Sequence, residues 1–129
     1  MAIVKLAVPI AIASLLSAAP AFATGTIHCE TSVRDGPEIY LVVGRGAAGS
    51  VTQMHLSGSA GQFTTGNGPT APVISQTWLD RQELKVDVID HNAEFHVARL
   101  IGRRAGENRY RATLRYRGRT YPMICAFED

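Results

Sequence analysis

Hydrophobic and polar residues alternate in short runs along this chain, and no run after residue 23 keeps a helical period. Alternation with a period of two puts successive side chains on opposite faces of a β-strand. Clusters of Gly, Pro, Asn and Asp separate the runs, as turns between strands require. The pattern predicts eight strands, at residues 25–33, 38–44, 50–57, 72–79, 82–90, 94–102, 108–117 and 119–127.

The connections between these runs are short except at residues 58–71, which read GSAGQFTTGNGPTA. This glycine-rich stretch is either a loop throughout or a loop that carries a short strand around QFTT. No internal repeat or domain boundary divides the runs. Eight short strands in series predict one all-β domain at 24–129, folded as a small antiparallel up-and-down β-barrel. A barrel-like sandwich of two sheets is the alternative architecture.

The segment before the predicted domain has the layout of a secretory signal peptide, which we assign to residues 1–23. Lys5 precedes an apolar run at 6–19, and AFA at 21–23 is a small-x-small cleavage pattern. The apolar run is shorter than the ~20 residues that a membrane-spanning helix needs, and it contains Pro9. We therefore expect cleavage after Ala23 and a periplasmic or secreted protein.

Two cysteines, Cys29 and Cys125, lie in the first and the last predicted strands. Disulfides persist in exported proteins, so we expect these two cysteines to form one intrachain disulfide. In a closed meander with an even number of strands the first and last strands are antiparallel neighbours, and the disulfide would hold that seam. A free pair of thiols or an intermolecular link is the alternative.

Side-chain parity predicts which residues face the interior. Residues 84, 86 and 88 share the inner face of one strand, and 110, 112, 114 and 116 share that of another. In the strand at 94–102, the same reading puts Phe95, Val97 and Ile101 inside, with Arg99 among them unless a bulge shifts the register. The aromatic residues that either pack as core or line a pocket for one small ligand are Tyr40, Phe63, Trp78, Phe95, Tyr110, Tyr116, Tyr121 and Phe127.

Charge is distributed unevenly, although the whole chain carries only +2. Residues 24–98 hold four basic and eight acidic side chains, whereas 99–119 hold eight arginines and one glutamate. Parity turns Arg109, Arg111, Arg115 and Arg117 outward on one strand, where they form a possible anion-binding stripe for phosphate, sulfate or carboxylate groups. A solvated, aggregation-resistant face is the alternative interpretation. Outward arginines also argue against a membrane-spanning barrel.

Signatures of catalysis are absent from the sequence, which has no G-x-S-x-G, H-E-x-x-H, Walker or dinucleotide-binding motif. We therefore expect a protein that is not an enzyme and uses no cofactor. Asp90, His91, Glu94 and His96 are close in sequence, but two of them fall in a turn, so we expect a polar hairpin tip and no metal site. We expect no nucleic-acid binding, because no aromatic residue shares the arginine face.

A signal peptide, a short all-β chain and a disulfide between terminal strands together resemble the plan of small periplasmic barrels, bacterial lysozyme inhibitors among them. This resemblance is one of architecture, and no motif in the chain names a family. We expect a monomeric, non-enzymatic binding or envelope-associated module whose partner is an anionic envelope component or an envelope protein. The alternatives are an inhibitor of a lytic enzyme or protease, with 58–71 as its protruding loop, and a carrier of a small apolar ligand.

Overall fold

The computed structural model describes residues 25–44 and 49–128 as strands, turns and loops, so the predicted signal peptide lies outside the described residues. Eight strands match the eight predicted ones, and the short β4 falls on QFTT, the place that the sequence left open. The nine strands of the described chain are β1 (Gly25–Thr31), β2 (Glu38–Gly44), β3 (Ser50–Gly58), β4 (Gly61–Thr64), β5 (Val73–Leu79), β6 (Glu83–Ile89), β7 (His96–Arg104), β8 (Arg109–Tyr116) and β9 (Arg119–Glu128).

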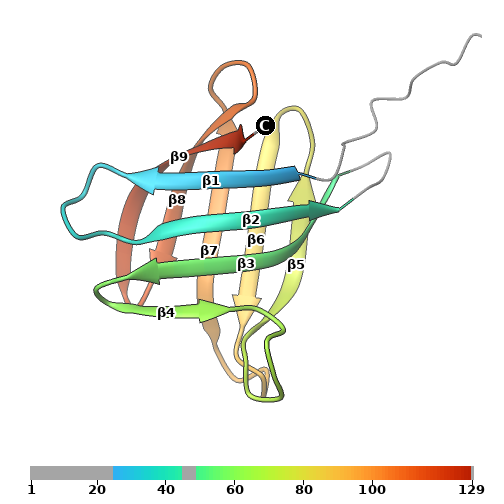
Figure 1. The fold of residues 1–129 in the computed structure, drawn as a ribbon, viewed down its shortest axis with the longest axis vertical. Coiled ribbons are helices and arrows are strands. Elements are labelled where there is room, and N and C mark those ends of the chain that lie inside the picture. Colours follow the sequence, from blue (N-terminus) through green and yellow to red (C-terminus); the bar gives the residue numbers. More distant parts are fainter. Residues whose placement is uncertain (1–24, 45–48, 129) are drawn as a thin grey trace, which may run out of the picture.

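All nine strands belong to one antiparallel sheet with the order β4-β3-β2-β1-β9-β8-β7-β6-β5. The sheet curls into a half-barrel, in which β1–β4 pass in front of β6–β8 and run across them (Figure 1). The all-β antiparallel fold predicted from the alternation is confirmed. Every predicted pairing between neighbouring strands is present along this order except the one across residues 58–71, where the sheet is open.

The open edge has a local cause, because β4 folds back onto β3 and takes its free edge. The register pairs His55 with Thr64 and Ser57 with Gln62, which leaves β5 without access to that part of β3. Only the start of β3 reaches β5, through a bridge between Gly49 and Leu79. The backbone N–H of Val51 also donates to Oγ1 of Thr77 at 3.2 Å. The two edges of the sheet therefore meet at one end and are kept apart at the other.

Strands β1 and β9 pair in the middle of the sheet and bring the two cysteines together. Cys29 and Cys125 are direct cross-strand partners, and the structure joins their sulfur atoms in a disulfide between positions 96 residues apart. Both residues are fully buried. The disulfide thus lies inside the curl, across the junction between the first and the last strand.

The core fills the concave side of the sheet with aliphatic side chains from almost every strand. Ile27, Leu41, Leu100 and Leu114 are each 0% exposed, and they come from four different strands. On β8 the pattern alternates strictly between exposed and buried positions, as the sequence predicted. Phe127 packs at the margin of this cluster, with its ring centroid 6.4 Å from that of Tyr110.

Strand β7 contradicts the predicted side-chain parity. Ala98 and Leu100 are buried, and Ile101 is 49% exposed. Val88 pairs with Ala98, but the next residue of β6, Ile89, pairs with His96. Val97 is therefore an extra residue on β7. One extra residue exchanges the two faces of a strand, so this β-bulge turns Arg99 and Ile101 outward.

Two aromatic residues expected in the interior are largely exposed, and a third, Tyr40, lies half-buried on the outer face of β2. Trp78 is 54% exposed and Phe95 is 61% exposed. Trp78 faces outward because a register irregularity in β5, between Ile74 and Gln76, changes the parity of that strand. Phe95 precedes β7 in the turn after β6, outside the ladder. Neither side chain is available to line an internal pocket.

Candidate functional site

Three of the four arginines of the predicted stripe share the outer face of β8. Arg109, Arg111 and Arg115 are exposed and alternate with buried neighbours. Arg117 lies in the turn between β8 and β9 with a φ of 51°, and its guanidinium carbon is 5.6 Å from the centroid of the Tyr116 ring. The turn conformation takes Arg117 out of the ladder, so the stripe on this strand is shorter than predicted.

The bulge in β7 adds two arginines to this surface. Arg99 pairs directly with Arg115 across the ladder, and Arg103 pairs with Arg111. We call the surface formed by Arg99, Arg103, Arg109, Arg111 and Arg115 the arginine face. Because the sequence parity had placed Arg99 inside, it missed that the positive charge spans two strands.

Few carboxylates compensate the arginine face. Arg99 Nε lies 3.6 Å from Oδ1 of Asp87 on β6. Glu83 is the cross-strand partner of Arg103, but its ion pair is with Lys85, at 3.7 Å. Among the described residues, no carboxylate lies within 4.0 Å of the four other guanidinium groups of this face. On β9 the partners of the outward residues of β8 are uncharged: Thr120, Pro122, Ile124 and Ala126.

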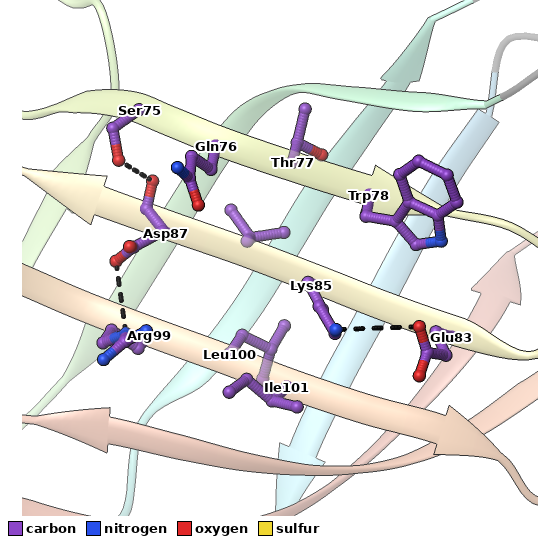
Figure 2. Close-up of a pocket in the computed structure, with 11 residues that line it drawn as sticks. Ser75, Gln76, Thr77, Trp78, Glu83, Lys85, Asp87, Arg99, Leu100 and Ile101 are labelled. Atoms are coloured by element: carbon purple, nitrogen blue, oxygen red, sulfur yellow. Dashed lines mark hydrogen bonds and ion pairs between the residues drawn. The ribbon is translucent and has the colours of Figure 1, made fainter.

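A shallow groove of about 590 Å³ borders the arginine face on the outer side of β5, β6 and β7. Figure 2 shows Lys85 between Trp78 and Ile101, with Asp87 and Arg99 further along the same surface. The Trp78 indole N–H donates to Oδ2 of Asp80 at 2.9 Å, which fixes the exposed ring. The groove therefore offers a hydrogen-bonded aromatic ring and an exposed isoleucine beside Lys85 and Arg99.

A second cluster, of opposite charge, lies on the outer face of β1, β2 and β9. His28 Nε2 is 2.5 Å from Glu38 Oε1 and 3.6 Å from Glu30 Oε1, and His28 Nδ1 is 3.4 Å from Glu128 Oε1. Tyr40 stacks on the imidazole with ring centroids 4.5 Å apart and donates its hydroxyl to Glu38 at 3.1 Å. We call His28, Glu30, Glu38, Tyr40 and Glu128 the histidine cluster.

The electrostatics of the histidine cluster act on the Tyr40 phenol. The hydrogen bond to Glu38 raises the pKa of Tyr40 above its ordinary value of 10.0, and burial and the charges of Glu38, Glu128 and Glu30 act in the same direction. No sequence motif signals this cluster, because its members come from three strands. Only the strand register brings position 128 next to position 28.

The acidic and histidine residues at 90–96 do not form one site. The Asp90 carboxylate accepts backbone N–H groups of Asn92, Glu94 and Phe95 at 2.7–3.2 Å. His96 Nδ1 instead lies 2.9 Å from Oδ1 of Asp87. Asp90 thus closes the turn between β6 and β7, as expected for a polar hairpin tip.

The glycine-rich stretch at 58–71 contains β4, and the segment after it is exposed. Thr65 is an exception, because it is 4% exposed and its Oγ1 accepts the Met54 N–H at 2.9 Å. Residues 66–70 are all exposed, and Gly66 and Gly68 adopt positive φ angles of 70° and 105°. This is where an inhibitory loop was expected.

Comparisons with known proteins assign no family. No protein-family model, no curated protein and no solved structure matches the chain. Within the described ranges, no helix is long and apolar enough to cross a membrane. The candidate site therefore has to be judged from its own geometry and charge.

Proposed function

We propose that the protein is an exported, non-enzymatic binding module whose arginine face binds phosphate groups presented by an anionic envelope component. In this proposal the curled sheet is a barrel-like scaffold, and residues 1–23 are the signal peptide that exports it. Guanidinium groups bind phosphate oxygens through paired N–H donors, which gives them an advantage over lysine for this ligand.

The observation that carries the proposal is the direct opposition of arginines on β7 and β8. Like charges that face each other across a ladder are destabilising, so the pairs Arg99–Arg115 and Arg103–Arg111 do not serve the stability of the sheet. A bound anion between the two members of a pair would remove this repulsion. The two pairs are four residues apart along each strand, which is roughly 13 Å, so they suit a ligand that carries more than one anionic group at about that separation.

The position of the two strands argues against a role in preventing aggregation. Charged side chains protect a sheet from edge-to-edge association when they lie on its edge strands. Strands β7 and β8 are both paired on both sides, and the edges of this sheet are β4 and β5. We therefore favour anion binding over the solvated-face interpretation. We also favour it over transport of an internal ligand, because fully buried aliphatic side chains pack the concave side.

The test compares two variants with the same change in net charge. One replaces Arg103, Arg109, Arg111 and Arg115 with Gln, and the control replaces four arginines outside the face, Arg34, Arg81, Arg117 and Arg119. We expect the first to bind polyphosphate beads at least tenfold more weakly than the control, since charged hydrogen bonds contribute about 1.5–3 kcal/mol each. Its melting temperature at low salt should equal or exceed that of the wild type.

The ligand source is distinguished by parallel binding to polyphosphate, to vesicles that contain phosphatidylglycerol and to lipopolysaccharide. Preference for the vesicles or lipopolysaccharide would point to the exposed Trp78 and Ile101 of the groove as additional contacts. Equal binding of the face variant and the control variant to all three would refute the proposal.

A further inference from the structure

The histidine cluster has the arrangement of side chains that a divalent transition metal requires. Three potential ligand atoms, one each from His28, Glu30 and Glu38, all lie within 4.8 Å of one another. They come from two neighbouring strands, because Cys29 pairs with Ile39 and so brings the outward residues on either side together. Zinc binds imidazole nitrogen and carboxylate oxygen at about 2.0–2.2 Å, so small side-chain rotations would close the three atoms around an ion.

The two nitrogens of His28 face different partners, which is the feature that distinguishes this cluster from a group of surface carboxylates. Nε2 faces Glu38 and Glu30, whereas Nδ1 faces Glu128. A metal-binding histidine usually donates its other ring N–H to a carboxylate, which sets the tautomer and the direction of the ring. A small rotation of Glu128, which lies 3.4 Å from Nδ1, would let it accept that proton and leave the Nε2 lone pair for a metal.

Tyr40 restrains both His28 and Glu38. Its ring lies almost parallel to the imidazole, with an interplanar angle of 12°, and restricts rotation of His28. Its hydroxyl donates to the Glu38 oxygen that faces His28. The His28 side chain is only 16% exposed, so the imidazole is held among its neighbours. Carboxylates that bind metals are commonly hydrogen-bonded in this way.

The charge of the cluster also favours a cation. Three carboxylates surround one imidazole, and in the part of the chain that the structure describes no lysine or arginine lies within 4.0 Å of any of them. A protonated histidine would neutralise one of three negative charges. A divalent ion would neutralise two and would use the ligand atoms that already converge.

We propose that His28 Nε2, Glu30 and Glu38 bind one divalent transition-metal ion, with Glu128 and Tyr40 as positioning residues. The single imidazole selects against Ca²⁺ and Mg²⁺, which take oxygen ligands, and suits Zn²⁺. Three protein ligands leave a coordination position for water or for a group of a partner. This site is on different strands from the arginine face and does not depend on phosphate binding.

The experiment is titration of the untagged mature protein with Zn²⁺ by calorimetry, with Mg²⁺ and Ca²⁺ in parallel. We expect one Zn²⁺ per chain and no saturable binding of the other two ions. His28→Gln and Glu38→Gln should abolish binding. Glu128→Gln and Tyr40→Phe should weaken it by about 10–100-fold, the usual effect of changing groups that orient a ligand. His55→Gln and His96→Gln are the matched controls and should bind as the wild type does.

X-ray absorption of the zinc-loaded protein provides a readout besides affinity. One nitrogen and two or more oxygen ligands at about 2.0–2.2 Å are expected for the wild type, whereas His28→Gln should retain no zinc to give a signal. Circular dichroism of each variant checks that the sheet is formed, and Glu30→Gln provides a milder change if His28→Gln does not fold. Absence of Zn²⁺ binding by the folded wild type, or undiminished binding by Glu30→Gln and Glu38→Gln, would overturn the site.

Discussion

At the scale of single residues, the Asp80 carboxylate orders both a turn and a neighbouring exposed side chain. Its Oδ1 accepts the backbone N–H groups of Gln82 and Glu83, both at 2.7 Å, and its Oδ2 accepts the Trp78 indole N–H. The N–H groups of Glu83 and Gln82 and the indole of Trp78 lower the pKa of Asp80 below its ordinary value. The same carboxylate therefore closes the turn between β5 and β6 and fixes the exposed ring in the groove.

The lowered pKa predicts how stability depends on pH. An aspartate that is harder to protonate in the folded state contributes stability above its unfolded pKa of about 3.9, and this contribution is lost as the pH falls through the folded pKa. We expect Asp80→Asn to lower the midpoint of urea unfolding at pH 7. The difference from the wild type should shrink below pH 4 and vanish at lower pH. A difference that stays constant between pH 7 and pH 2.5 would contradict the assignment.

The sequence identified some of these residues and not others, for physical reasons. Alternation showed which residues of β8 face outward, because no bulge interrupts that strand. It did not show that Trp78 is exposed, because an aromatic residue in a strand is usually buried. The bond from Trp78 to Asp80 depends on the turn geometry, which the sequence alone does not define.

At the scale of elements, the pair β7 and β8 combines a bulge with a close backbone approach. Gly102 and Ala112 are direct partners on the inner face. A Cβ atom added at Gly102 would lie 2.9 Å from the Ala112 Cβ and 3.3 Å from the Arg111 carbonyl oxygen. The absence of a side chain at position 102 thus lets β7 and β8 approach each other closely here. The same two strands carry the arginine face on their other side.

We therefore expect Gly102→Ala to destabilise the fold by about 1–3 kcal/mol, the usual cost of overpacking. Adding Ala112→Gly removes the opposing methyl group and should recover part of this loss, although Ala112→Gly alone is destabilising. The measurement is a double-mutant cycle from urea unfolding. If the two changes are strictly additive, the two positions do not interact as the structure indicates.

The sequence predicted the inner and outer faces correctly for strands in which hydrophobic and polar residues alternate without a bulge. Strands β6 and β8 kept one parity from end to end and were predicted with their correct faces. In β7 the extra residue is Val97, and its neighbour Ala98 is also apolar, so the sequence did not show that the parity of the inner face changes at this point. The error mattered for the candidate site, because it hid two arginines that oppose the predicted stripe.

At the scale of the whole molecule, opposite charges occupy different parts of the convex surface. The arginine face lies on β7 and β8, whereas the histidine cluster lies on β1, β2 and the far end of β9. The sequence predicted an uneven charge along the chain, but no acidic cluster. Glu30 and Glu38 come together through the β1–β2 pairing. Glu128 joins them through the central β1–β9 pairing, which also brings the cysteines together.

The disulfide across this pairing should account for a large part of the stability. A cross-link that closes a loop of 96 residues removes about 4–5 kcal/mol of unfolded-chain entropy in the chain-entropy model. We expect the oxidised protein to show no free thiol after denaturation, by titration with a thiol reagent. Reduction should lower the unfolding free energy by about 2–5 kcal/mol. Two titratable thiols per chain in unreduced protein would show that the cysteines are not bonded.

The β1–β9 pairing also has a consequence for the order of folding. The sheet consists of two local meanders, β1–β4 and β5–β9, which can form from contacts between strands adjacent in sequence. Their junction joins positions almost a hundred residues apart, and such contacts form late, because the entropy of closing the loop must be lost first. Both cysteines are fully buried once the junction exists. An oxidising catalyst must therefore reach them while the two halves are still separate or only loosely docked.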